Sequence, residues 1–145
     1  MGLFSGKRPK GLGVHEGRLQ ACSWKPNCVN SMADASADPG HSIAPLAFGA
    51  KAETAWADLA ALVKGQERVN VVKEESGYLY AEFRSRGMGY VDDVEFLLDA
   101  SAGVIHIRSA SRLGIRDFGV NRARIEALRW ALGDTAGPTI GGKVR

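Results

Sequence analysis

The sequence lacks any hydrophobic stretch long enough to cross a membrane, and its first residues lack the apolar core of a secretory signal. The opening segment reads MGLFSGKRPKGLGV, in which Leu3 and Phe4 are the large apolar residues before the glycines. Position 6 is glycine, where an N-myristoylation signal carries serine or threonine. These absences predict a soluble, cytoplasmic protein without a membrane span.

Residues that usually bind metals are scarce, with 2 cysteines and 3 histidines in 145 residues. His15, His41 and His106 do not stand at a zinc-binding spacing from Cys22 and Cys28. The sequence also lacks a G-x-S-x-G nucleophile motif, a phosphate-binding loop and a dinucleotide-binding fingerprint. We therefore expect neither a metal site nor a cofactor.

The charge balance is mildly basic, with a formal net charge of +3 and an isoelectric point near 9.0. No long basic run or aromatic stacking motif accompanies this excess, so nucleic-acid binding is not expected. Arginine carries most of the excess, concentrated between Arg108 and Arg129. Because a guanidinium grips a carboxylate or phosphate with two parallel hydrogen bonds, this composition favours an anionic partner.

The length and the 45% hydrophobic content fit one globular domain with a core of useful size. Residues 1–49 read as an irregular segment rich in Gly, Pro, Asn, Asp and Ser, which wraps or precedes the domain. Residues 50–133 form the expected α+β core. We expect residues 134–145 to form a loose C-terminal tail.

Apolar residues recur at helical spacing over residues 50–63 and 120–132, and Gly65 and Gly133 supply the stop signals. Strand-like runs cover residues 69–74, 78–85, 90–98 and 104–110. Short polar or glycine-containing turns separate them, which favours an antiparallel meander. The predicted fold is α+β, a single antiparallel sheet of about four strands backed by two helices.

Alternation divides the predicted strands into two faces. One face is apolar and should meet the helices: Leu79, Ala81, Phe83, Val94, Phe96, Leu98, Ile105 and Ile107. The other face is polar: Tyr80, Glu82, Arg84, Arg86, Asp93, Glu95, His106 and Arg108. Matching core to core would place Arg84 near Asp93, and Glu95 near Arg108. This face is either a solvated surface crossed by salt bridges or a polar cleft.

The connection SASRLGIRDFGVNRAR leads from the last predicted strand into the second helix. Free N–H groups at the helix start, with Arg112, Arg116, Arg122 and Arg124 close in sequence, are the ingredients of an anion site. Alternatively, Asp117 or Asn121 caps the helix and the arginines bind the acids of the sheet.

Two functions from different classes remain open. The first is a binding or interaction module whose arginine-rich surface holds an anionic small molecule, a lipid headgroup or an acidic protein segment. The candidate ligand-binding residues are Arg84, Arg86, Asp93, Glu95, Arg108, Arg112, Asp117, Asn121 and Arg122. The second is a small hydrolase-like enzyme in which Asp93 or Glu95 acts as a base and arginines polarise the substrate. Asp92 and Asp93 point to opposite faces of a regular strand and do not act together.

Cys22 and Cys28 are separated by five residues, including the turn-forming Pro26 and Asn27. The spacing permits a small disulfide loop, or a pair of structural thiols. A cysteine nucleophile would need a neighbouring base, which a sequence does not reveal. In the cytosol such a disulfide would be reduced or regulatory.

Several words of the sequence resemble the bacterial and plant family catalogued as domain of unknown function fourteen ninety-nine. They are KRPKGLGV, PNCV, AEFRSR, GYVDDVEF and SASRLGIRDFGVNRARIE. The resemblance covers nearly the whole chain up to the second predicted helix, and it implies no established activity. Members commonly read C-P-D-S-P-N-C-V-S-S, whereas this chain reads CSWKPNCVNS. The change between the cysteines weakens any proposal that those side chains perform chemistry.

Overall fold

A computed structural model describes residues 4–133 of the chain. Its elements are β1 (Val14–His15), β2 (Arg18–Leu19), β3 (Cys28–Asn30), β4 (Leu46–Ala47), α1 (Ala52–Lys64), β5 (Val69–Glu75), β6 (Tyr78–Arg84), β7 (Val91–Asp99), β8 (Val104–Ser111) and α2 (Val120–Leu132). The tail expected at 134–145 lies outside the described residues.

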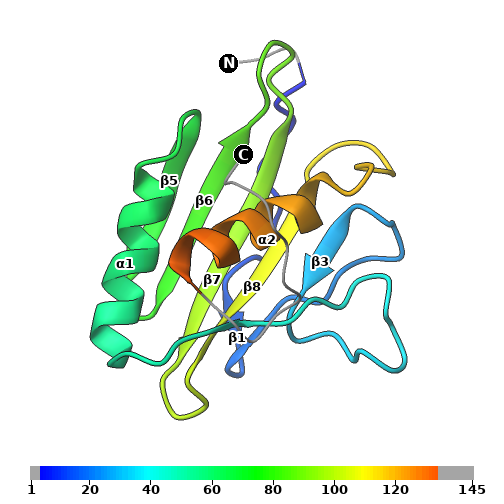
Figure 1. The fold of residues 1–145 in the computed structure, drawn as a ribbon. Helices are drawn as coiled ribbons and strands as arrows, with labels where there is room; N and C mark the ends of the chain where they lie inside the picture. Colours follow the sequence, from blue (N-terminus) through cyan, green and yellow to red (C-terminus); the bar gives the residue numbers. More distant parts are fainter. Residues whose placement is uncertain (1–3, 134–145) are drawn as a thin grey trace.

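The main sheet has six strands, in the order β3-β8-β7-β6-β5, with β4 also paired to β8 (Figure 1). Every pairing in it is antiparallel. The four long strands follow the predicted meander. The expected single sheet of about four strands is nevertheless wrong. The short strands β3 and β4, of 3 and 2 residues, extend the main sheet, and β1 and β2 pair in a separate two-stranded sheet. Strands this short within an irregular segment show no alternation that a sequence pattern can detect.

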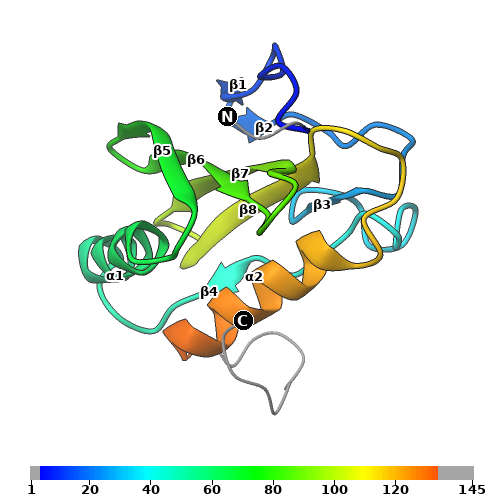
Figure 2. The ribbon, with the colours of Figure 1, turned by 90° about the horizontal axis from the view of Figure 1, so that it is seen from above.

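Both helices lie on one face of the sheet, while the N-terminal segment crosses the other (Figure 2). The second helix begins and ends at the predicted residues, and Gly133 ends it in the left-handed conformation, at φ 76°. The apolar face of the sheet packs against the helices as predicted. Its fully buried members include Leu79, Ala81, Val94, Phe96, Ile105 and Ile107.

The charged face of the sheet is not solvated, because residues from Ser5 to Met32 lie against it. A small second core forms there, in which Leu19 packs with Tyr78 and Tyr80. Glu82, Asp93 and Glu95 are 4%, 1% and 0% exposed. The sheet is therefore covered on both faces, by helices on one side and by an irregular strap on the other.

Candidate functional site

The register of the sheet decides which of the charged side chains meet. Glu95 lies opposite Arg108, as the sequence predicts. Glu82 rather than Arg84 lies opposite Asp93, and Arg84 lies opposite Val91. The predicted pairing of Arg84 with Asp93 is thus wrong. Residues 85–90 connect the two strands, and the length of this turn sets the register.

Arg112, directly after β8, is the centre of a buried ion-pair network. Its Nε and Nη2 atoms donate to the two oxygens of Asp93 at 3.1 and 2.6 Å. Nη2 also donates to Glu82 Oε2 at 2.7 Å. Arg8, from the N-terminal segment, approaches the same Glu82 oxygen at 2.9 Å. Arg112 thus links β7 to β6, and Arg8 links the N-terminal segment to β6.

The carboxylates in this network have their oxygens occupied. Burial opposes ionisation of Glu82, but hydrogen bonds from Arg8, Arg112 and Asn70 outweigh it and lower its pKa to about 2. The Tyr80 hydroxyl donates a hydrogen bond to Asp93 at 2.5 Å. Burial is the larger cause and this bond the second cause that raises the pKa of Tyr80.

Glu95 lies one pleat further along the same face. Tyr78 donates its hydroxyl to Glu95 Oε2 at 2.5 Å, and the Gly13 amide donates to the same oxygen at 2.7 Å. The other oxygen, Oε1, is buried without a hydrogen-bond partner among the described residues. A carboxylate with no exposure to solvent has no route to a substrate in this conformation.

The sequence left two possibilities for the start of α2, an external anion or a capping side chain. The carboxylate of Asp117 occupies this position. Asp117 accepts hydrogen bonds from the amides of Gly119 and Asn121, both at 3.0 Å. Burial opposes ionisation of Asp117, but the hydrogen bonds from Asn121 outweigh this effect, so the pKa of Asp117 lies below its ordinary value. The Asn121 side chain is itself buried and accepts a bond from Ser109 at 2.6 Å. Capping and cross-linking account for both residues.

A groove of about 980 Å³ lies on the helix side of the molecule, between α2, the end of β6 and the loop after α1. Apolar side chains that line it include Phe83, Val120, Ala123, Ala127, Leu128 and Trp130. Five arginines line it as well, namely Arg68, Arg84, Arg86, Arg122 and Arg124. The groove thus combines apolar surface with an excess of positive charge.

Each carboxylate that lines the groove is already paired. Asp92 binds Arg124 at 2.7 Å, and Arg124 also lies 4.9 Å from the centre of the Phe83 ring. Burial raises the pKa of Asp92 against the pull of Arg124. Glu126 binds the buried Arg129 at 2.5 Å. Neither Asp92 nor Glu126 is therefore available to neutralise Arg84 or Arg122.

Glu67, the third acid of the groove, contacts Arg68 at 3.1 Å and Arg86 at 3.9 Å, on the exposed rim. Arg84 and Arg122 pair with no carboxylate in the part of the chain that the structure describes. Arg122 donates to the carbonyl of Gly40 at 3.2 Å. Nη1 of Arg84 is buried with no hydrogen-bond partner among the described residues.

The structure therefore divides the residues selected from the sequence into three places. Arg84, Arg86 and Arg122 line the groove. Asp117 caps α2, and Asn121 lies in the first turn of that helix, where its amide donates to Asp117. Asp93, Glu95, Arg108 and Arg112 lie on the opposite face of the sheet, beneath the N-terminal strap.

Sequence reasoning missed Arg68 and Trp130 as groove residues. For Trp130 a signal exists, because Arg122, Glu126 and Trp130 are spaced four residues apart and share one side of α2. Arg68 precedes β5 without any pattern that marks it. Its proximity to α2 results from tertiary packing alone.

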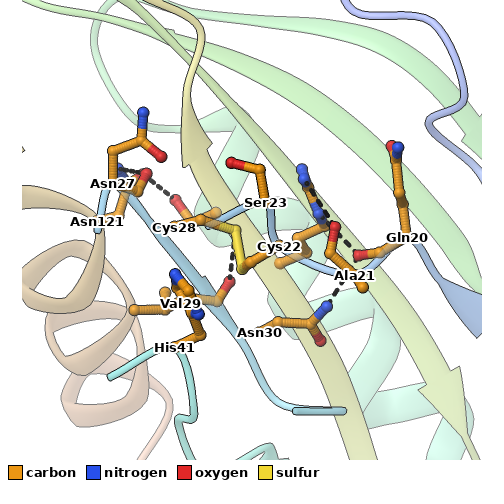
Figure 3. Close-up of a disulfide and its surroundings, with 12 residues drawn as sticks. Gln20, Ala21, Cys22, Ser23, Asn27, Cys28, Val29, Asn30, His41 and Asn121 are labelled. Carbon is orange, nitrogen blue, oxygen red and sulfur yellow. Dashed lines mark hydrogen bonds between the residues drawn. A yellow bond between two sulfur atoms is a disulfide. The ribbon is translucent and has the colours of Figure 1, made fainter. Parts of the chain in front are cut away.

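Cys22 and Cys28 form a disulfide with an S–S distance of 2.03 Å (Figure 3). The bond closes the loop that holds Pro26 and Asn27. Asn27 fixes this loop to the segment after β8, since its carbonyl accepts a bond from the Ser111 amide at 2.9 Å and its side chain donates to the Gly114 carbonyl at 2.8 Å. The disulfide and these two bonds attach the loop to the end of β8 and the segment after it.

Residues 4–133 contain no cluster of three or more His, Cys, Asp or Glu side chains arranged to hold a metal ion. Over the same residues, neither helix has the length and apolar character needed to span a membrane.

Comparison with known proteins gives one match. No curated protein and no solved structure matches the chain. A family model described as "Protein of unknown function (DUF1499)" matches residues 18–132, which include β3 to β8 and both helices. Since this match covers most of the chain and agrees with the motifs read from the sequence, the chain belongs to the DUF1499 family.

Proposed function

We propose that the protein is a binding module whose groove holds a small amphiphilic anion, a molecule with a carboxylate or phosphate head and an apolar body. The volume of about 980 Å³ falls at the upper end of the range for small-molecule pockets. The groove supplies apolar walls from α2 and β6 for the body of such a ligand. It supplies Arg84 and Arg122 for the head.

The observation that carries the proposal is the unpartnered Nη1 atom of Arg84. A buried donor without an acceptor costs about 1–3 kcal/mol. Because the Arg84 side chain lines the groove and is only half-buried, a rotation of its guanidinium would bring Nη1 to an anionic oxygen there. Hydrogen bonds between a guanidinium and an ionised acceptor are among the strongest that proteins form. Arg122 lines the groove from α2 and would add a second positive charge to it, while its Nη2 atom donates to the Gly40 carbonyl.

Calorimetric titration with octyl phosphate, and with octanol as the uncharged counterpart, tests this function. The expected result is saturable binding of octyl phosphate that is at least tenfold tighter than that of octanol. Arg84→Ala and Arg122→Ala should each weaken it about tenfold or more, whereas Arg116→Ala, outside the groove, should not. Equal affinity for both compounds, or unchanged affinity in both groove variants, would overturn the proposal.

An acidic protein segment is the main competing occupant of the groove. Binding of an acidic peptide that is weakened by Arg84→Ala, together with no binding of octyl phosphate, would favour this alternative. The hydrolase-like alternative has less support. Asp93 has both oxygens engaged by Arg112, and Glu95 is completely buried, so neither carboxylate is placed to act as a base on a bound substrate.

A further inference from the structure

Arg108 of β8 is a buried cation whose charge is not matched by a contacting carboxylate. It is 8% exposed, and its Nε and Nη2 atoms donate to the carbonyls of Gln20 and Ala21 at 2.9 and 3.4 Å. Glu95, opposite it in the register, turns one oxygen to Tyr78 instead. Arg108 makes no ion pair with any residue of the described range 4–133.

An uncompensated charge of this kind is expensive, because removal from water costs a guanidinium several kcal/mol unless an anion replaces the solvent. Burial lowers the pKa of Arg108, although Glu95 and Asp93 act in the opposite direction from a distance. Carbonyl dipoles recover part of the lost solvation. A counter-anion would recover more.

A cavity of about 160 Å³ adjoins Arg108 on this face of the sheet. Its charged lining residues are Lys10, Lys25, Asp93, Arg108 and Arg112. Asp93 and Arg112 neutralise one another through their paired contacts. Lys10 and Lys25 form no ion pair within the described part of the chain, so their charges add to that of Arg108, which Glu95 offsets only from a distance.

We propose that this cavity is a binding site for a small phosphate-like oxyanion, held by Arg108 with Lys10 and Lys25. The site is separate from the groove beside α2 and lies on the other face of the sheet. Its volume is below the range of drug-sized ligand pockets, which fits an inorganic oxyanion or the head of a small acid. Gln20, Ser23 and Asn27 also line it and offer neutral polar contacts.

The disulfide forms one wall of this site. Ser23, Lys25, Asn27 and Cys28 line the cavity, and all four belong to the loop that Cys22–Cys28 closes. Figure 3 shows Ser23, Asn27 and Cys28 around this disulfide. The bond fixes the backbone that carries Lys25 against β3 and β8. Since a pre-positioned cation loses less conformational entropy on binding, opening the disulfide should weaken the oxyanion site without removing any of its charges.

The test is a titration of the oxidised full-length chain with inorganic phosphate at constant ionic strength, followed by amide chemical shifts. Saturable changes are expected in residues 23–28 and 108–112, with a midpoint that differs from that of any changes in residues 119–127 of the groove. Replacing both Lys10 and Lys25 with alanine should weaken binding at least tenfold. The double variant Lys51→Ala/Lys73→Ala loses the same charge elsewhere and should bind normally.

Two further variants separate this site from its alternatives. Arg84→Ala should leave phosphate binding at residues 23–28 unchanged, which distinguishes the cavity from the groove. Cys22→Ser combined with Cys28→Ser should weaken phosphate binding at least threefold while the dispersion of the spectrum shows a folded chain. Shifts that do not saturate, or an affinity unaffected by loss of both lysines, would refute the site. An affinity unaffected by loss of the disulfide would refute the role of the loop.

Discussion

Arg112 holds Asp93 by two hydrogen bonds across the buried face of the sheet, Nε to Oδ2 at 3.1 Å and Nη2 to Oδ1 at 2.6 Å. Both side chains are shielded from solvent, at 6% and 2% exposure. The strap residue Ser5 accepts a third bond from the same guanidinium, at 3.3 Å. This pair explains part of the charge density of the sequence as internal cross-linking between sheet and strap.

Removing that guanidinium should destabilise the protein strongly. Arg112→Ala leaves Asp93 and Glu82 buried without their shared cation, and breaking a buried pair in this way costs about 3–5 kcal/mol. Urea unfolding followed by circular dichroism measures the loss. Arg116→Ala, an exposed arginine four residues away, should change the free energy of unfolding by less than about 0.5 kcal/mol. A loss below about 1 kcal/mol for Arg112→Ala would contradict the network.

Glu82 should make the stability of the protein depend on pH in the acidic range. Its pKa in the folded state, about 2, lies below the ordinary value of 4.5, so the ionised form stabilises the fold. This contribution is complete above about pH 5–6 and disappears as the pH falls through the ordinary value toward 2. The stability difference between the native chain and Glu82→Gln should therefore shrink from pH 7 to pH 3.

Urea unfolding at pH 7, 5 and 3 measures that difference. Glu53→Gln, at an exposed position in the first turn of α1, serves as the control and should show little dependence on pH beyond that of the native chain. A difference that stays constant across the three values would show that the Glu82 carboxylate is not stabilised in the folded protein.

The disulfide should contribute to stability because it closes a short loop. For a loop of this length, chain entropy predicts about 2 kcal/mol. Reduction of the native chain, or Cys22→Ser with Cys28→Ser, should lower the midpoint of thermal unfolding accordingly. If both treatments leave the midpoint unchanged, the bond does not constrain the unfolded chain as expected.

Thiol alkylation of the protein taken directly from cells would test the predicted cytoplasmic location, since disulfides seldom persist there.

Phe118 lies two residues before the start of α2 in a left-handed backbone conformation, at φ 54°, and its side chain is 93% exposed. A non-glycine residue pays about 1–2 kcal/mol in this region, and asparagine tolerates it better than phenylalanine. Phe118→Asn should therefore raise the free energy of unfolding by about 1 kcal/mol. Ile115→Asn, exposed on the same loop without this conformation, should have no such effect. A destabilised Phe118→Asn would indicate that the ring makes contacts of its own.

The sequence predicted the four long strands, both helices and the division of the sheet into two faces, because these depend on periodicity over seven or more residues. It did not reveal β3 and β4, whose 3 and 2 residues leave no measurable pattern. It also wrongly placed Arg84 opposite Asp93, because strand alternation does not determine the register of two neighbouring strands.

The candidate residues could be named from the sequence but not sorted. Whether an arginine is consumed by a carboxylate depends on partners far away in the chain, as when Arg8 reaches Glu82 across 74 positions. Arg84 and Arg112 looked alike as arginines at the ends of strands. Tertiary packing surrounds Arg112 with acceptors. It leaves Arg84 with a buried nitrogen that has no acceptor among the described residues.

The most direct test of the proposed function is the fluorescence of Trp130, which lines the groove and is half-exposed. With Trp24 and Trp56 replaced by phenylalanine, Trp130 reports on the groove alone. We expect a saturable blue shift on addition of octyl phosphate. Arg84→Ala should weaken the apparent affinity about tenfold, and octanol at the same concentration should cause no shift. A spectrum that does not change, or that changes equally with octanol, would contradict the assignment of the groove as an anion-binding site.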